Sequence, residues 1–283
     1  MTATEIIALT AAAAAGGAIN AVAGGGTLVT FPTLLLFGTA SKVANATSTL
    51  ALVLGTSGSI FGFRRHIEAA KPWLWLFLPA SLIGGVVGAV LLTLTRERIF
   101  ARLVPFLILF ATVLFVSQTL IRRWLKVVSS SERSETPIPN ESSSSPVHSA
   151  PNQGESRRLL DNHALLGAVL FQFAVALYGG YFGAGIGILM LASLSMIGLH
   201  NIHEMNTIKT ILGSLINLVA AIWFIFAGLM DWPRAGVMTF GAIVGYFLGA
   251  HYSLRLPQHH VRRIVTAIGF TLAAITFYQQ FLR

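Results

Sequence analysis

The sequence predicts an all-α membrane protein built from two homologous halves, and three observations lead to this prediction. Hydrophobic residues make up 54% of the 283 residues and charged residues only 10%, whereas soluble domains usually carry about 25% charged residues. Long apolar runs recur along the chain, and a helix needs about 20 such residues to cross the hydrocarbon core of a bilayer. The pattern of the first half also returns in the second half. We therefore expect most of the protein surface to face the lipid bilayer.

The apolar runs fall into two groups, one on each side of a polar segment. Each group contains four long runs and one short apolar piece that follows a glycine cluster. No Lys or Arg precedes the first run, which therefore lacks the positive region of a cleaved signal peptide, and we expect it to remain as a membrane segment. The long runs are Glu5–Val22, Ala44–Phe63, Pro72–Leu94, Ile99–Ile121, Ala164–Phe182, Met205–Leu229, Trp232–Tyr252 and Val261–Leu282, and the short pieces are Thr27–Phe37 and Ile188–Leu199.

The polar segment between the two groups has a different composition. It contains the serine runs Ser129–Ser131 and Ser142–Ser145, and it also contains four prolines. Such a segment buries too little apolar area to offset the entropy that is lost on ordering. We predict a first membrane repeat at residues 1–125, a disordered cytoplasmic linker at 126–159 and a second membrane repeat at 160–283.

One constant shift, which places Gly24 on Gly185, aligns the two halves without a gap. Matches between apolar residues carry little weight in a membrane protein, but matches at glycine, proline, asparagine and arginine in one register rarely arise by chance. The halves are therefore interpreted as structural repeats. The matched pairs are Gly24 with Gly185, Gly26 with Gly187, Asn45 with Asn206, Thr49 with Thr210, Pro72 with Pro233, Gly84 with Gly245, Gly88 with Gly249 and Arg102 with Arg263.

The distribution of basic residues predicts the orientation of the halves, because Lys and Arg favour cytoplasmic loops. If the linker is cytoplasmic and each short piece crosses the membrane, 13 Lys and Arg residues lie inside and 6 lie outside. Each half then has about five membrane segments, and the halves are inverted relative to each other, as in many secondary transporters. If the short pieces only enter and return, each half has four crossings and the repeats run parallel. The charge distribution favours the inverted arrangement.

The glycine clusters are candidate binding elements. Gly24, Gly25 and Gly26 follow Asn20 in the first half, and Gly183 and Gly185 occupy the matching region of the second half. Glycine weakens a helix by about 1 kcal/mol relative to alanine, so each cluster predicts a broken helix. The first N–H groups of the helix that follows a break attract anions. The alternative interpretation is that these glycines only let helices pack closely.

Two matched polar segments follow the short apolar pieces. Asn45 and Thr49 share one helix face, as do Asn206 and Thr210. These four residues are candidate substrate ligands, although helix capping by the two asparagines is an alternative. Lys209 occurs in one half only. A lysine inside the membrane indicates a functional site, but its side chain can also extend to the interface.

Other patterns favour structural roles or exclude functions. The glycine stripes at Gly84 and Gly88, and at Gly241, Gly245 and Gly249, indicate close helix packing. The formal charge of +9 is explained by membrane topology, so no nucleic-acid partner is expected. His200 and His203 have a spacing that suits a metal, but the pair is not repeated, and we expect no metal site. No phosphate-binding loop occurs, and no cofactor is expected.

These residues resemble the sulfite exporter TauE/SafE family. The resemblance rests on Gly24–Gly26 followed by Pro32, on the Asn45 segment, and on Gly183–Gly187 followed by Asn206. It covers both halves outside the linker. It implies a multi-pass carrier of the bacterial inner membrane that exports sulfite, sulfoacetate or another small anion. The Ser-rich linker and Lys209 are features of this chain that do not identify the substrate.

The sequence therefore predicts transport of a small anion by alternating access between the two repeats. A passive anion channel is the alternative, because sequence does not separate it from a carrier. A membrane enzyme is disfavoured because no nucleophile, base and acid are grouped, and a scaffold would give the paired glycine breaks no purpose. No particular oligomeric state is favoured.

Overall fold

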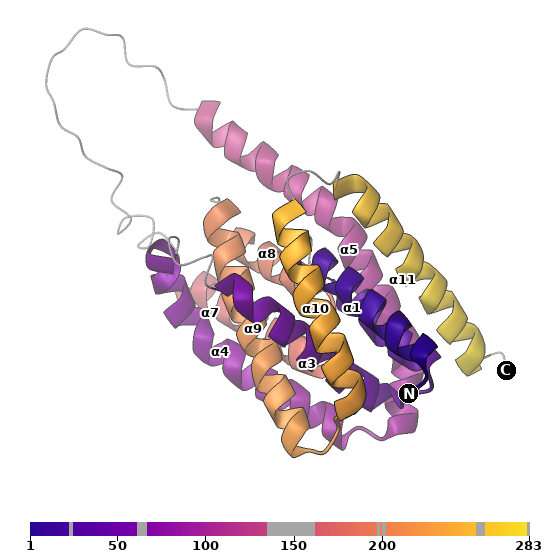
Figure 1. Ribbon diagram of the computed structural model, residues 1–283. Coiled ribbons are helices and arrows are strands. Elements are labelled where there is room, and N and C mark those ends of the chain that lie inside the picture. The colour runs from indigo at the N-terminus through magenta and orange to yellow at the C-terminus, as the bar shows by residue number, and fades with distance from the viewer. Residues whose placement is uncertain are drawn as a thin grey trace, which may run out of the picture.

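The computed structural model describes residues 1–22, 25–60, 67–134, 162–196, 199, 202–252 and 258–281, and within these ranges all regular structure is helical (Figure 1). The first half contains α1 (Ala3–Val22), α2 (Thr27–Leu36), α3 (Ser41–Ile60), α4 (Ile67–Leu94) and α5 (Glu97–Ser134). The second half contains α7 (Asn162–Tyr181), α8 (Ile186–Met196), α9 (Ile202–Phe226), α10 (Trp232–Tyr252) and α11 (Gln258–Phe281). Every apolar run and short piece identified in the sequence contributes a helix.

The surface of this bundle suits a lipid environment. Four helical stretches in the described part of the chain are long and apolar enough to cross a membrane, and three further apolar helices are shorter. Large apolar side chains are exposed on the outside, for example Phe226, Phe240 and Phe247. The prediction of an all-helical membrane protein is confirmed, and the number of crossings stays a prediction. The four long stretches are Ala3–Ala21, Ala70–Leu94, Glu97–Ser117 and Glu204–Phe226.

The helix α5 is longer than the sequence pattern predicts. It continues to Ser134, so the first residues of the segment assigned to the linker are helical. Residues 135–161 lie outside the described residues. The predicted boundary at residue 126 rested on the end of the apolar run, but a helix that leaves the hydrocarbon layer needs no apolar residues to keep its backbone hydrogen bonds.

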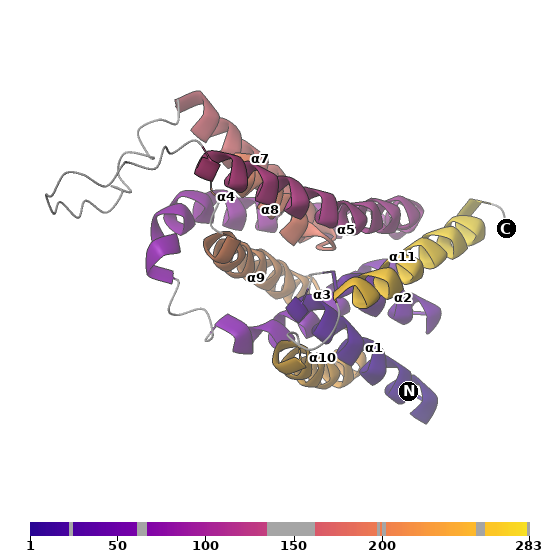
Figure 2. The same cartoon turned by 90° about the horizontal axis from the view of Figure 1, so that it is seen from above.

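The two halves are packed into each other (Figure 2). Helix α1 of the first half packs against α10 of the second, and α7 of the second half packs against α4 of the first. In the same way, α3 packs against α10 and α9 packs against α4. The register that pairs Gly24 with Gly185 also relates α1 to α7, α3 to α9 and α4 to α10, so each of these contacts has a counterpart with the halves exchanged.

The glycine stripes lie at the contacts between the halves. A β-carbon placed on Gly84 would lie 2.7 Å from the carbonyl oxygen of Phe173 in α7, and one placed on Gly249 would lie 2.6 Å from the Cα atom of Ala18 in α1. Contacts this close leave no room for any side chain. The prediction that these glycines serve helix packing is therefore confirmed.

Helix α2 returns the chain to the end of the bundle where α1 begins. At its start, Gly26 lies beside Gly16 and Asn20 of α1. Just after its end, the carbonyl of Phe37 accepts a hydrogen bond from Arg234, which also binds Glu5 near the start of α1. The last turns of α5 lie at the opposite end of the bundle (Figure 1). The first half therefore starts and finishes at opposite ends.

An ion cluster joins the halves at the end where α1 begins. Arg234 of α10 donates to Oε1 of Glu5 and to Oδ2 of Asp231, both at 2.7 Å. The side chain of Glu5 is only 10% exposed. The backbone N–H of Asp231 also donates to Oγ1 of Thr47 in α3 at 3.3 Å. These bonds connect α1 and α3 of the first half to α10 and the loop before it in the second half.

Replacing Arg234 with methionine should destabilise the protein. Removal of one partner from a buried ion pair leaves an uncompensated charge and costs about 3–5 kcal/mol; partial exposure of Arg234 will make the loss smaller. We expect a lower melting temperature in detergent for Arg234→Met. The control is Arg102→Met, which removes an exposed arginine. Equal melting temperatures for the two variants would contradict the assigned role of the cluster.

Candidate substrate site

The interruption between α1 and α2 is built on glycine. Gly25 has a φ of +104°, a conformation that is strained for residues with a side chain. The N–H of Leu28 donates to the carbonyl of Gly25 at 3.0 Å, which starts α2. Asn20 lies beside this point, since its Cβ atom would be 3.3 Å from a β-carbon on Gly26. Gly24, a predicted site residue, lies outside the described residues.

The interruption between α7 and α8 has the same character. Gly183 and Gly185 have φ values of +80° and +81°, and both therefore require glycine. The N–H of Phe182 donates to the carbonyl of Tyr178 at 2.9 Å, and the N–H of Ile188 donates to the carbonyl of Gly185 at 3.0 Å. The first bond closes α7 and the second opens α8. Helix α8 thus begins inside the bundle with its first N–H groups lacking intrahelical partners.

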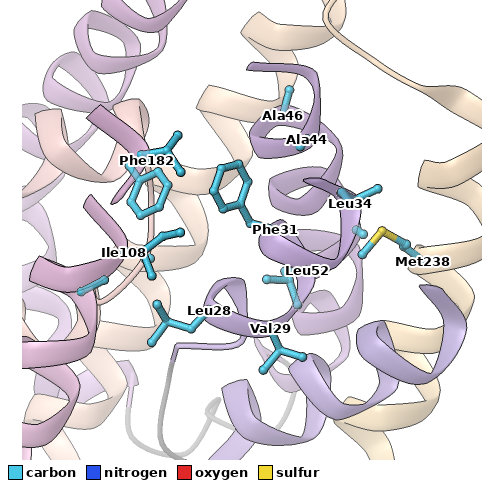
Figure 3. Close-up of a cluster of buried hydrophobic side chains, with 14 of the residues drawn as sticks. Leu28, Val29, Phe31, Leu34, Ala44, Ala46, Leu52, Ile108, Phe182 and Met238 are labelled. Carbon is cyan, nitrogen blue, oxygen red and sulfur yellow. The ribbon is translucent and has the colours of Figure 1, made fainter. Parts of the chain in front are cut away.

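The two interruptions lie against the same stretch of α5. A β-carbon on Gly25 would be 3.1 Å from the ring of Phe115, and one on Gly185 would be 3.5 Å from Leu114. Phe31 of α2 also meets Phe182 edge to face, with 5.4 Å between the ring centroids. Figure 3 shows the side chains of Phe31 and Phe182 next to each other, with Ile108 beside them. In this conformation, buried apolar side chains fill the space between the interruptions.

Asn45 reaches from the first half to the interruption of the second half. Its Nδ2 atom donates to the carbonyl of Tyr181 at 3.2 Å, and the residue is only 1% exposed. Its Oδ1 atom has no hydrogen-bond partner among the described residues. The capping alternative for Asn45 is wrong, because α3 begins at Ser41 and places Asn45 in its second turn. It is also wrong for Asn206, since α9 begins at Ile202.

Polar side chains next to Asn45 extend this buried region. Thr49 donates to the backbone carbonyl of Asn45 at 2.8 Å, which places both residues on one face of α3 as predicted. Thr30 of α2 and Ser48 of α3 are fully buried, and their hydroxyl oxygens lie 2.6 Å apart. Sequence reasoning missed this pair. The only feature of the sequence that could have drawn attention to Ser48 was its alignment with Lys209 in the repeat register.

The second half places its predicted residues on α9. Asn206, Lys209 and Thr210 are all partly buried. The carbon stem of Lys209 runs past the start of α8, because a β-carbon on Gly187 would be 3.2 Å from Cδ of Lys209. The aliphatic part of the Lys209 side chain therefore packs against the first turn of α8.

Asn217 was not identified from the sequence, yet it lies at an interruption. A β-carbon on Gly183 would be 3.3 Å from Oδ1 of Asn217, and this oxygen has no hydrogen-bond partner among the described residues. Its counterpart in the first half is Thr56, so the repeat gave no signal. His200 lies outside the described residues, the side chain of His203 is not described, and no metal-binding group of three or more residues occurs in the described ranges.

Comparisons with known proteins agree with this architecture. A sequence model of the family described as "Sulfite exporter TauE/SafE" matches residues 9–276. A "Probable membrane transporter protein" of Haemophilus influenzae is 26% identical over 93% of this chain and 90% of its own length. "Probable membrane transporter protein YfcA" of Escherichia coli K12 is 23% identical over 93% of this chain and 86% of its own length. No solved structure matches the chain significantly.

Proposed function

Because the chain belongs to the sulfite exporter TauE/SafE family, we propose that it is a secondary transporter that exports sulfite or an organosulfonate such as sulfoacetate. Relatives that match nearly the whole chain are named as probable membrane transporters in bacteria, and we place this protein in a bacterial inner membrane. The observation that carries the proposal is the hydrogen bond from Asn45 of one half to the interrupted backbone of the other. This bond joins both halves at one site.

The chemistry of the interruptions suits a small anion. The N-terminus of a helix carries a partial positive charge and unpaired N–H groups, and α8 begins beside Lys209. In the proposal, N–H groups at α2 and α8, together with Asn20, Asn45 and Asn206, replace the water around the substrate. Lys209 supplies a full positive charge to the site.

The contact pattern supports alternating access between inverted repeats. In the proposal each half has about five membrane segments, and α2 brings the chain back to the side on which α1 begins. An odd number of segments per half inverts one repeat relative to the other. The packed pair Phe31 and Phe182 would then separate when the two halves move, and this motion would open the site to one side of the membrane.

Uptake into proteoliposomes tests the proposal. Labelled sulfite, sulfoacetate and sulfate should be compared with and without a proton gradient. A carrier will show flux that saturates and that is accelerated by substrate on the opposite side. Flux that stays linear in concentration, without such exchange, would indicate the channel alternative. Liposomes with protein that take up none of these anions faster than empty liposomes would overturn the proposal.

Lys209→Met should weaken substrate binding. A hydrogen bond to a charged group contributes about 1.5–3 kcal/mol, so the KM for sulfite should rise about 10- to 100-fold. Lys209→Arg keeps the charge and should restore part of the affinity. Lys71→Met, which removes an exposed lysine, is the control and should leave the KM unchanged. A KM for Lys209→Met equal to that of the control would remove Lys209 from the site.

A further inference from the structure

The amide of Asn45 presents an acceptor that nothing in the described part of the chain satisfies. Because Nδ2 lies 3.2 Å from the carbonyl oxygen of Tyr181, the orientation of the amide is settled: a reversed amide would set two acceptors against each other. Oδ1 therefore faces away from Tyr181, buried and without a described partner. A buried acceptor that lacks a donor costs about 1–3 kcal/mol. A donor from a ligand would recover this energy.

A second acceptor of the same kind lies at the same interruption. Oδ1 of Asn217 comes from α9, lies beside Gly183 and has no partner among the described residues. The two amides thus approach residues 181–183 from different helices, one from each half of the chain. Bare oxyanions such as sulfate and the sulfite dianion carry only acceptors, so they cannot bond to either amide oxygen.

We propose that this site selects monoanions that carry an O–H donor close to their negative charge, such as hydrogensulfite or a hydroxyalkanesulfonate. The O–H group donates to Oδ1 of Asn45 or Asn217, and the charged oxygens face the helix N-termini and Lys209. This inference rests on the proposed function and narrows its substrates to hydrogensulfite and hydroxylated sulfonates. Sulfoacetate carries two negative charges and no hydroxyl group, so by this inference it binds less tightly than either.

The selectivity follows from unpaired groups. A site built to bond a substrate hydroxyl strongly rejects the analogue that lacks it, because the buried acceptor is then left without a donor. For one acceptor, a loss of about 1.5–3 kcal/mol corresponds to a factor of about 10–100 in affinity. A pocket that recognised only the shape and charge of the anion would bind the hydroxylated anion and its analogue without a hydroxyl group equally well.

A matched pair of substrates tests the proposal. Isethionate (2-hydroxyethanesulfonate) and ethanesulfonate have the same charge and differ only in the hydroxyl group. In proteoliposomes with the wild-type protein, isethionate should compete with labelled sulfite at a concentration about 10- to 100-fold lower than ethanesulfonate. Sulfite flux should also rise as pH falls, in step with the fraction present as hydrogensulfite. Equal competition by the two sulfonates would overturn this inference while leaving the proposed transport in place.

One variant tests whether the amide of Asn217 causes this selectivity, and a second variant is its control. The selectivity ratio is the competing concentration of ethanesulfonate divided by that of isethionate. Asn217→Leu should reduce this ratio, because it removes one acceptor for the isethionate hydroxyl. Thr39→Val should leave the ratio unchanged, although Oγ1 of Thr39 is likewise buried without a described partner, because Thr39 lies in the connection before α3 and away from the interruption. An unchanged ratio in Asn217→Leu would overturn the assignment of this residue.

Two further outcomes are decisive without any variant. If the amide oxygens instead hold a cation such as Na⁺, flux will require Na⁺ and the two sulfonates will compete equally, and the inference fails. If no anion is transported at all, the proposed function fails and this inference fails with it.

Discussion

Gly245→Leu is expected to prevent the assembly of the two halves. A β-carbon at this position would overlap the backbone of Ala14 in α1, including its carbonyl oxygen. Backbone atoms cannot rotate aside as a side chain can. The whole of α10 would therefore have to move away from α1. The destabilisation should therefore exceed the ~1–3 kcal/mol typical of overpacked cores. Size-exclusion chromatography in mild detergent should show aggregated protein.

The control for this prediction lies on the same helix. Gly236 of α10 has no atom within 4 Å of the position where a β-carbon would stand, and Gly236→Leu should elute as a single symmetric peak. At the contact between α4 and α7, Gly88→Leu and Gly167→Leu form an equivalent pair, because Gly88 of α4 packs against α7 and Gly167 of α7 has open space. If both variants of a pair elute alike, close packing at the glycine stripe does not hold the halves together.

Asn45→Ala is expected to abolish transport while the protein still inserts. The substitution removes the hydrogen bond to Tyr181 and the side chain that joins α3 to the α7–α8 interruption. It leaves the carbonyl of Tyr181 without this donor and takes an amide out of the proposed site. Efflux of labelled sulfite from right-side-out vesicles, or its uptake into everted vesicles, should fall to the background level at an unchanged amount of membrane-inserted protein.

A second buried hydrogen bond between the halves provides the control. Gln172 of α7 donates to Oγ of Ser81 in α4 at 2.9 Å, and both side chains are buried. Ser81→Ala removes this bond more than two helical turns from the α7–α8 interruption. The variant should lose about 1 kcal/mol of stability and retain transport. Similar loss of transport in Ser81→Ala and Asn45→Ala would mean that any weakened contact between the halves inactivates the protein.

Hydrophobic length and glycine spacing were sufficient to predict the helices and the faces of α4 and α10 that pack closely, although not the helices that they pack against. Apolar runs of about 20 residues leave few alternatives to a membrane helix, and the stripes at Gly84 and Gly245 can pack only against backbone. Helix starts were less predictable. Helix α3 begins at Ser41 because the carboxylate of Glu97 accepts hydrogen bonds from the N–H groups of Ser41 and Lys42. Glu97 lies far from Ser41 in sequence, beyond the whole of α4, so Asn45 was wrongly considered as a cap.

The candidate site was predictable in its repeated parts and not elsewhere. The glycine clusters around Gly25 and Gly183 predict broken helices, and Asn45 aligns with Asn206 when the two halves are superimposed in sequence. The contacts of Asn45 with Tyr181 and of Asn217 with Gly183 depend on how the halves meet, which no local pattern encodes. Apolar closure by Phe31 and Phe182 was not foreseen either, because phenylalanine is common in any membrane helix.

The exchange of helices between the halves has a consequence for biosynthesis. Within the described part of the chain, α7 covers the face of α4 that carries Gly84 and Gly88, and α10 covers the face of α1 that receives Gly245. When the ribosome has completed α5, both faces therefore still lie open to lipid or to the insertion machinery. The nascent first half therefore remains without these packing partners until α7 and α10 of the second half have been translated. Severing the gene between α5 and α7 should thus yield fragments that are short-lived apart and rescued when they are co-expressed.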